Sequence, residues 1–507
     1  MTTNKGVSYF TGEYGSSDSV SFHMPGHKGA DIFRRFGHEA LLKDHPDRDI
    51  TEIHGADNLF QPEGIIGETM EKYRKLYHSS ASYLLVNGSS GGLIAAVMAC
   101  VRPGEKLIMA RNCHKSVFNA LRLGGVVPVF AYPEIIEEYG ISGAVSVEHI
   151  SDLVEEHPDA KAIILPSPNY YGICSDIAVI ADIAHKVGMT LIVDQAHGAH
   201  LKFFERAGAT GGEALEGTCA SGSVSMPPSA ESSGADLVIN STHKTLCSLT
   251  QSAVLNVLRA DNHVTPDPFV LEDRLQMIQS TSPSYILMES LDVNADILAD
   301  HGDELIKDWA ANLEMFYREA SKIPGLKVMS FAGLDHTKLN LDMSLLGIDG
   351  AHLDQKLREE GIYAELHTGN ILMCMTGIGN TEDDYMRLLA ALKKISEGSS
   401  ADLGSKHIAG GEAQQGEVTA DESGAGPWTA RRKWAQIPDE SVLVDLSHAP
   451  GKVCAAALIP YPPGIPLLCP GEIISEEDVR YISLLRKRGE KVIGVDHKGR
   501  VAVGGPV

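Results

Sequence analysis

The 507-residue sequence predicts an α/β protein whose central sheet is mostly parallel and covered by helices on both faces. Three observations support this fold class. Several runs of strand length, such as 83–86 and 161–165, are almost wholly apolar, as strands buried on both faces are. Helical patterns alternate with these runs. Polar or glycine-rich segments follow the runs directly, at the sheet edge where α/β proteins bind ligands.

Composition narrows the functional class. The formal net charge of -24 argues against the basic surface of a nucleic-acid-binding protein. Eight cysteines without a C-x-x-C pair favour a reduced, cytoplasmic chain without a zinc site. Residues 1–15 lack the apolar core of a signal peptide, and apolar stretches such as 93–101 are too short to span a bilayer. We therefore expect no metal, no membrane segment and no nucleic-acid partner.

Shifts in composition divide the chain into five segments. They are an N-terminal arm with active-site loops (1–75), a large domain (76–324), a smaller α+β domain (325–396), a flexible linker rich in Gly, Ser, Ala and Glu (397–427) and a C-terminal α+β domain (428–507). The arm is rich in His, Gly and Asp, and we expect it to lack regular secondary structure. Residues 205–233 are Gly-, Ser- and Ala-rich and predict an excursion inserted into the large domain.

Periodicity and capping residues then place the elements in order. The expected strands are 83–86, 106–110, 126–130, 161–165, 190–193 and 236–240, and the first two expected helices are 91–101 and 116–123. In the smaller domain, Thr381 is positioned to cap a helix with Leu388, Leu389, Leu392 and Ile395 on its core side. In the C-terminal domain, Ser475 and Asp478 predict another helix start.

Lys244 is the most informative single residue. It follows the buried strand 236–240 and the residues Ser-Thr-His, a poor place for a solubilising lysine. Taken alone, a strand-end lysine is more often structural. The strand 190–193, however, leads into Asp194. A lysine for a Schiff base and an aspartate that keeps the pyridine nitrogen protonated, at neighbouring strand ends, are what pyridoxal phosphate requires.

Two further loops lie at the same predicted edge. Ser89, Ser90 and Gly91 join a strand to an apolar helix, so free backbone N–H groups there could cradle a phosphate. A glycine turn with a serine cap explains the same pattern equally well. His114 follows the next strand and could lie flat on an aromatic ring, although a lone histidine is more often a capping or core residue.

Five ordered motifs carry a family resemblance. They are His-Met-Pro-Gly-His-Lys (23–28), Asn-Gly-Ser-Ser-Gly (87–91), Asn-Cys-His-Lys-Ser (112–116), Asp-Gln-Ala-His-Gly-Ala-His (194–200) and Ser-Thr-His-Lys-Thr (241–245). Together they resemble the ornithine/lysine/arginine decarboxylases, which are fold-type I, aspartate-aminotransferase-like pyridoxal 5'-phosphate enzymes. The resemblance covers residues 20–395 and returns at 461–466, and it matches the short form without an N-terminal wing domain.

The resemblance implies a role for each motif residue. Lys244 resembles the Schiff-base lysine, Asp194 the partner of the pyridine nitrogen, and His114 the ring stacked on the cofactor. The phosphate ligands implied are Ser89, Ser90 and Ser241, with Gly91 beside them. His197 is expected near the phenolic oxygen of the cofactor, and His243 near the phosphate or the substrate. Either His243 or Lys244 would return a proton to the product.

The implied reaction is decarboxylation of a basic amino acid, arginine or lysine ahead of ornithine, to an amine that feeds polyamine metabolism. The acidic candidates for the substrate's cationic end are Glu365, Asp57 and Glu63, and a solvated surface role suits each equally. The segment with Thr281 and Ser282 resembles one that crosses the interface of a homodimer or higher oligomer. Gln195, where many short members carry glutamate, leaves substrate identity open.

Two alternatives remain. One is a different fold-type I reaction on the same cofactor, either transamination or β-elimination. The other is a non-catalytic protein that keeps the fold.

Overall fold

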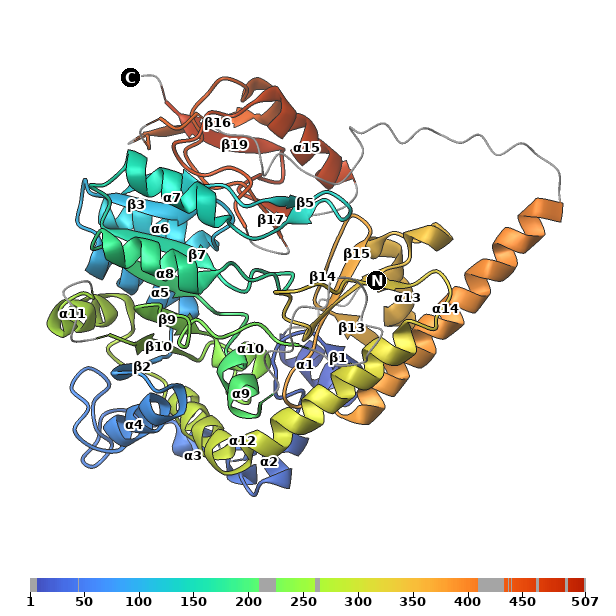
Figure 1. Ribbon diagram of the computed structural model, residues 1–507, viewed down its shortest axis with the longest axis horizontal. Coiled ribbons are helices and arrows are strands. Elements are labelled where there is room, and N and C mark those ends of the chain that lie inside the picture. Colours follow the sequence, from blue (N-terminus) through green and yellow to red (C-terminus); the bar gives the residue numbers. More distant parts are fainter. Residues whose placement is uncertain are drawn as a thin grey trace.

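The computed structural model describes residues 7–43, 45–208, 225–259, 265–408, 433–435, 437–438, 440–461, 465–487 and 491–505 (Figure 1). Within these ranges no helix has the length and apolarity needed to cross a bilayer. The same ranges contain no group of three His, Cys, Asp or Glu residues that could hold a metal ion.

A seven-stranded sheet forms the centre of the large domain. In spatial order its strands are β2 (Ala81–Leu85), β10 (Ala253–Val257), β9 (Leu237–Asn240), β8 (Thr190–Asp194), β7 (Ala162–Pro166), β3 (Lys106–Ala110) and β4 (Val127–Ala131). Neighbours from β9 to β4 pair in parallel, and β10 runs antiparallel to both β2 and β9. The predicted fold class is confirmed, with each expected strand within two residues of its observed bounds.

Helices cover both faces of this sheet. The connecting helices are α5 (Gly88–Cys100), α6 (Lys115–Gly124), α7 (Val147–Glu156), α8 (Ile177–Lys186) and α11 (Pro268–Ile278). Side chains alternate along β2, so Leu85 packs in the cluster that includes α5, whereas Leu84 packs in the cluster that includes α4 (Ile65–Tyr77) and α12 (Tyr285–Ala320). Both leucines are at most 1% exposed. Because both faces of the sheet are covered, its strands do not alternate between polar and apolar residues.

The N-terminal arm is more regular than its composition predicts. It contains α1 (Val7–Gly15), β1 (Val20–Phe22), α2 (Asp31–Arg35), α3 (His45–Arg48) and α4. The prediction of an irregular segment is therefore wrong for α4, where Ile66, Tyr73 and Tyr77 are buried. These residues recur at helical spacing, a signal that the high content of His, Gly and Asp obscured.

The smaller domain is built on a four-stranded sheet in the order β11 (Lys327–Val328), β12 (Lys338–Asp342), β15 (Ile371–Met375) and β14 (Leu366–Thr368). It also contains α13 (Gly350–Glu359), β13 (Ile362–Ala364) and α14 (Glu382–Ile408). The arm joins this domain because β1 pairs in parallel with β13. The long helices α12 and α14 pack side by side (Figure 1).

Helix α14 begins as predicted. The backbone N–H of Thr381 donates to Asp384, and all four core leucine and isoleucine residues are buried. The helix continues to Ile408, however, into the stretch 397–427 that the composition assigns to a linker. Residues 397–408 include good helix formers such as Glu397, Ala401 and Leu403 among the glycines and serines, so composition alone misplaces this boundary. Residues 409–427 lie outside the described ranges.

The C-terminal domain pairs β16 (Ser441–Asp445) with β19 (Arg500–Gly504) and β17 (Ile459–Tyr461) with β18 (Lys491–Ile493). Its helix α15 (Glu476–Lys487) starts at the predicted capping box, where Ser475 N–H donates to Asp478 and Asp478 N–H donates to Ser475 Oγ. This domain docks on the β3 side of the large domain (Figure 1). Arg111, at the end of β3, makes the contact by a buried, two-pronged bond to Glu472.

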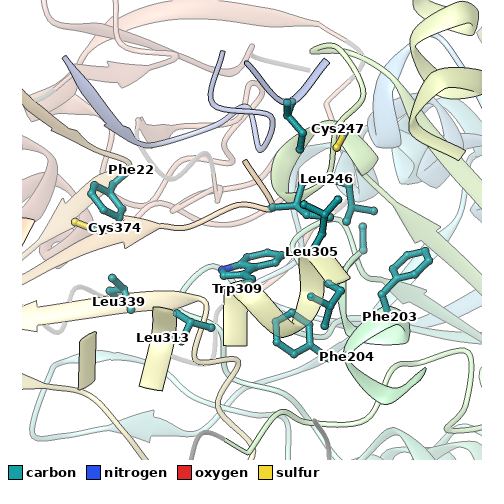
Figure 2. Packing of buried hydrophobic residues seen from close by; sticks show 14 of the residues in the cluster. Phe22, Phe203, Phe204, Leu246, Cys247, Leu305, Trp309, Leu313, Leu339 and Cys374 are labelled. Carbon is teal, nitrogen blue, oxygen red and sulfur yellow. The ribbon is translucent and has the colours of Figure 1, made fainter. Parts of the chain in front are cut away.

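A core of large side chains lies where the large and small domains meet (Figure 2). Trp309 of α12 is 1% exposed and packs against Phe204 at 5.3 Å between ring centroids. Its indole N–H donates to Thr376 of the small domain. This core fixes the two domains against each other beneath the strand ends that carry the predicted site.

Candidate functional site

A cavity of about 350 Å³ opens at the carboxyl ends of the parallel strands. Its lining comes from loops after β2, β3, β7, β8 and β9 and from the N-terminal arm: Met24, Asn87, Gly88, Ser89, Ser90, Asn112, His114, Lys115, Pro166, Pro168, Asn169, Tyr170, Asp194, Ala196, His197, His243, Lys244, Thr250 and Gln251. The structure thus brings together the predicted lysine, aspartate, histidines and serine loop around one space of ligand size.

Lys244 lies on the short helix α10 (Thr242–Thr245), directly after β9. Its amine is 2.8 Å from Nε2 of His197 and 5.8 Å from the ring centroid of Tyr170. Burial lowers the pKa of Lys244 to about 8, and the carboxylates of Asp194 and Glu365 partly oppose that change. A lysine with this pKa has a substantial neutral fraction near neutrality and is a competent nucleophile.

Close backbone packing holds the lysine segment in place. Gly26 of the His-Met-Pro-Gly-His-Lys motif lies so near Thr245 that a Cβ on it would be 2.3 Å from a backbone carbon of Thr245. The N–H of Gly26 donates to the carbonyl of His243, and the N–H of Ile378 donates to the carbonyl of Thr245. A Cβ on Gly377 would in turn collide with Gly26. Glycine is required where three backbones meet this closely.

Asp194 ends β8 and is 5% exposed. One carboxylate oxygen accepts the N–H of Ala196. Burial raises the pKa of Asp194, while the charge of Lys244 acts in the opposite direction. A buried carboxylate that lines a ligand-sized cavity fits a cationic group, such as a protonated ring nitrogen.

His197 is buried and neutral, because burial lowers its pKa well below the usual value. Its Nε2 faces Lys244, whereas Nδ1 has no hydrogen-bond partner among the described residues. Asn112, which also lines the cavity, leaves its side-chain oxygen without a partner in the same part of the structure. Buried polar atoms of this kind are usually satisfied by a ligand or water.

The serine loop connects β2 to α5 and has the geometry of an anion cradle. Gly88 adopts a left-handed φ of 68°, which turns the chain into the first turn of α5. The hydroxyl of Ser241 donates to that of Ser89 at 2.8 Å, so the two loops meet at this point. Ser90 and Gly91 follow in the same helical turn, where N–H groups and the helix dipole favour a phosphate.

The two flanking histidines differ in their tautomers. His243 Nδ1 lies 2.7 Å from the carbonyl of Ser252, which can only accept, so Nδ1 carries the proton and Nε2 carries the lone pair. Burial lowers the pKa of His243 to about 4 and that of His114 to about 3. His114 also caps α6, with Nδ1 accepting the N–H of Ser116. His114 therefore both caps α6 and lines the cavity.

The three acidic residues predicted to bind the cationic end of the substrate lie in different parts of the structure. Asp57 accepts backbone N–H groups of Asn58, Glu63, Gly64, Ile66 and Gly67, and so fixes the start of α4. Glu63 is exposed and lines a different cavity, of about 240 Å³, beside β2. Glu365 lies near the lysine cavity, because its carboxylate accepts the N–H of Met24, a lining residue. Thr281 and Ser282 are exposed in the link between α11 and α12.

Gln195, the departure from the family pattern, is fully buried behind the site. Its side-chain amide donates to the carboxylate of Glu231 at 2.7 Å, and that carboxylate also accepts from Asn240. Glu231 belongs to the end of the 205–233 excursion, of which residues 209–224 lie outside the described ranges. A carboxylate thus lies in contact with position 195, supplied from elsewhere in the chain.

Sequence reasoning missed several lining residues, including Tyr170, Asn112, Thr250 and Gln251. Tyr170 follows β7 closely, so the strand-end rule that located Asp194 could have found it. Gln251 adopts φ of 83°, uncommon for a residue other than glycine, and its side chain donates to the carbonyl of Val86 beside the serine loop. That conformation is visible only in three dimensions.

Comparisons with known proteins agree with this geometry. Residues 10–332 match the family model of the Orn/Lys/Arg decarboxylase major domain, and residues 423–500 match that of the C-terminal domain. Arginine decarboxylase of Bacillus subtilis is 33% identical over 489 residues, 93% of this chain and 91% of the relative. Arginine decarboxylase of Bacillus anthracis is 31% identical over 496 residues, 95% of this chain and 93% of the relative.

Solved structures show the same fold. The lysine decarboxylase LdcF of Francisella novicida superposes with a TM-score of 0.70 at 20% identity, covering 98% of this chain and 80% of that one. Pyridoxamine-pyruvate aminotransferase of Mesorhizobium loti gives a TM-score of 0.54 at 16% identity, over 76% of this chain and 93% of that one.

Proposed function

The chain belongs to the Orn/Lys/Arg decarboxylase family, and we propose that it decarboxylates a basic amino acid with pyridoxal 5'-phosphate bound covalently to Lys244. Arginine and lysine are favoured over ornithine as substrates, because the relatives compared above are named arginine or lysine decarboxylases. The observation that carries the proposal is the buried lysine of lowered pKa, in a cavity that also exposes a buried carboxylate to a ligand.

The donor set fits the cofactor. When bound, pyridoxal phosphate supplies an electron-accepting ring that makes loss of the substrate carboxylate possible. Lys244 would hold its aldehyde carbon and Asp194 its ring nitrogen. Ser89, Ser90 and Ser241, with Gly91, would hold the phosphate, and His114 would cover one face of the ring. The unsatisfied Nδ1 of His197 would gain an acceptor from the bound cofactor or the substrate.

Two residues are candidates for donating the proton that replaces the carboxylate on the α-carbon of the substrate. The amine of Lys244 exchanges a proton near neutrality because its pKa is about 8. His243 holds a proton at Nδ1 against the Ser252 carbonyl, so its exchangeable position is Nε2. With a pKa of about 4, His243 is neutral at pH 7 and has no proton at Nε2 to supply. Lys244 is the stronger candidate for the donor.

Specificity for a basic side chain requires an acidic group at the far end of the cavity. Among the three acidic candidates, Glu365 is the one joined to a cavity residue. We propose Glu365 as the anchor for the substrate's cationic end, with the exposed Thr281–Ser282 segment contributing from a partner subunit in a homodimer. The seven described cysteines are free, which fits the proposed cytoplasmic location. The amine formed would be supplied to polyamine synthesis.

The proposal is tested by incubating the purified chain and pyridoxal phosphate with arginine, lysine or ornithine and separating the products. We expect the corresponding amine from at least one substrate. Formation of a 2-oxo acid instead of an amine would assign the protein to transamination. Absence of any product would favour a non-catalytic role.

A further inference from the structure

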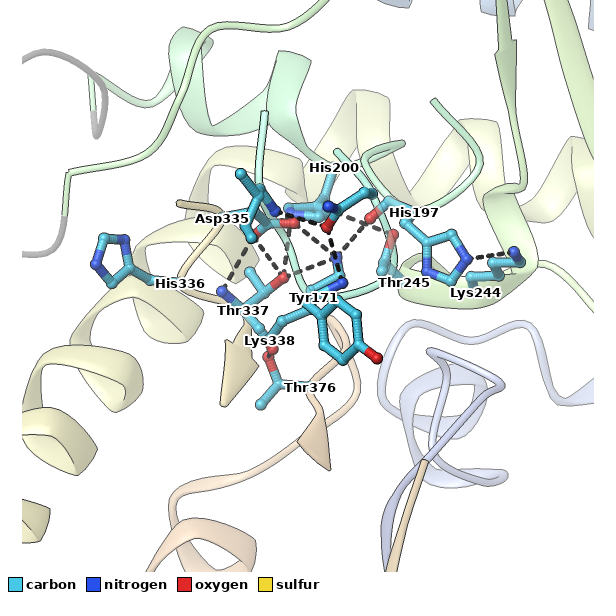
Figure 3. A network of polar contacts seen from close by, with 12 residues as sticks. Tyr171, His197, His200, Lys244, Thr245, Asp335, His336, Thr337, Lys338 and Thr376 are labelled. Carbon is cyan, nitrogen blue, oxygen red and sulfur yellow. Dashed lines mark hydrogen bonds and ion pairs between the residues drawn. The ribbon is translucent and has the colours of Figure 1, made fainter. Parts of the chain in front are cut away.

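A cluster of charged residues is buried between the two domains, directly behind the site (Figure 3). Asp335 and Lys338 come from the start of the small domain's sheet, and His200 follows β8 in the large domain. All three side chains are 0% exposed. A completely buried lysine is rare, and the reaction proposed above does not use this one directly.

Every hydrogen-bond donor of Lys338 is used. Its ammonium donates to Asp335 Oδ2 at 2.6 Å, to the hydroxyl of Thr337 at 3.1 Å and to the backbone carbonyl of His197. The other carboxylate oxygen of Asp335 accepts from Thr337 and lies 3.1 Å from His200 Nε2. The charged groups of Lys338 and Asp335 are therefore paired within the cluster, and Lys338 also contacts the site through the carbonyl of His197.

The cluster touches the site at two points, on either side of the covalent lysine. One is the carbonyl of His197, whose ring contacts Lys244. The other is Thr245, the neighbour of Lys244 in sequence, whose hydroxyl is 3.2 Å from His200 Nδ1. Figure 3 shows these contacts converging from the two domains. A cluster that served the domain interface alone would need neither contact, and an apolar pair of similar volume would stabilise the fold as well.

We propose that Lys338, Asp335 and His200 form a positioning unit that holds His197 and Lys244 in register for cofactor capture. The inference rests on the proposed function. Lys338 fixes the backbone of His197, and His200 fixes the side chain of Thr245, so the small domain sets the geometry of the amine. None of the three residues lines the cavity, and they act through His197 and Thr245.

The fixed charge of Lys338 has a second effect. Asp194 and Glu365 raise the pKa of Lys244, whereas burial and Lys338 lower it, and neutral His197 contacts the amine. The charges that shift the pKa of Lys244 include Lys338 but not Asp335, so removing the charges of both residues raises that pKa. A purely structural role for the cluster would not produce a change in that direction.

The test compares full-length wild type with Lys338→Met/Asp335→Asn, which removes both charges and keeps similar volumes, and with Thr245→Val, which breaks only the contact to His200. Asp236→Asn is the matched control: it alters a fully buried carboxylate at the opposite end of β9, where Asp236 binds the N–H of Leu191. Two quantities are measured by cofactor absorbance: the dissociation constant of pyridoxal phosphate and the pH midpoint of the absorbance change.

We expect the double variant to bind the cofactor about tenfold more weakly and its midpoint to move to higher pH. Thr245→Val weakens binding about threefold, the effect of one neutral hydrogen bond, with the midpoint unchanged. Asp236→Asn changes neither. If the double variant does not fold, Thr245→Val with unaltered affinity overturns the inference.

The inference is also overturned if wild type binds the cofactor and the double variant matches Asp236→Asn in both quantities. Failure of wild type to bind the cofactor at all would instead contradict the proposed function. The two failures are therefore distinguishable.

Discussion

The amine of Lys244 lies 2.8 Å from Nε2 of His197, although Lys244 lies on α10 after β9 and His197 lies in the loop after β8. The parallel pairing of β8 with β9 places the segments after these two strands next to each other. Because His197 is neutral, its Nε2 can accept a hydrogen bond from the amine of Lys244. This contact joins Lys244 to the buried cluster of Lys338, Asp335 and His200.

Replacing Lys244 by alanine removes the amine that we propose binds the cofactor covalently. We expect no cofactor attachment after borohydride reduction and a loss of activity of about 10³-fold or more. Peptide mapping of the reduced wild type would locate the label. The control is Lys161→Ala, an exposed lysine before β7, which keeps both properties. Attachment at another lysine would contradict this assignment.

Asp194→Asn keeps the shape of the side chain and removes its charge. In the proposed site, Lys244 should still capture the cofactor, but the ring nitrogen would lose its ionic partner and the ring would become a poorer electron acceptor. We expect kcat to fall by about 10²- to 10⁴-fold, with covalent attachment retained. Steady-state kinetics beside borohydride labelling separate the two effects. An Asp194→Asn protein with wild-type kcat would exclude the role given to this carboxylate.

Gly26→Ala tests the three-backbone contact behind Lys244. A Cβ there meets the backbone of Thr245, which cannot move without shifting the lysine. We expect the free energy of unfolding to fall by about 1–3 kcal/mol and cofactor binding to weaken. Gly12→Ala is the control, because a Cβ at Gly12 meets nothing within 4 Å. Chemical denaturation measures both variants, and equal stability would refute the packing argument.

Arg111 and Glu472 should account for the docking of the C-terminal domain. The guanidinium also donates to the carbonyls of Pro466 and Leu467 and lies over the rings of Phe118 and Phe130. Arg111→Met leaves a buried carboxylate unpaired, so we expect a loss of about 3–5 kcal/mol. The double variant Arg111→Met/Glu472→Met should lose less than the single one. Additive losses in denaturant unfolding would mean that the pair is not coupled.

The pKa of about 8 for Lys244 predicts how cofactor capture depends on pH. The neutral amine is the reactive form, and a lowered pKa makes it available at lower pH. The rate of capture by the cofactor-free protein should therefore rise with pH up to about 8 and then level off. Stopped-flow absorbance measures this rate. A rise that continues to pH 10 would indicate a lysine of ordinary pKa.

The sequence reveals the parallel part of the sheet because buried strands of this kind are continuous apolar runs. It also reveals residues at strand ends, such as Asp194 and Lys244, since parallel strands end at one edge. Contacts that depend on the small domain leave no local pattern. Lys338 is an ordinary lysine in sequence, and its burial follows only from the packing of β12 against the segment after β8. The contact of Glu231 with Gln195 within the large domain also leaves no local pattern, because the two residues are 36 positions apart in the sequence.

Decarboxylation is tested most directly with arginine, lysine and ornithine labelled at the carboxyl carbon, each incubated with the protein and pyridoxal phosphate. We predict that wild type releases labelled carbon dioxide from at least one of the three, matched by an equal amount of amine, and that Lys244→Ala releases none. Retention of the label in all three reactions, with the cofactor bound to Lys244, would contradict it.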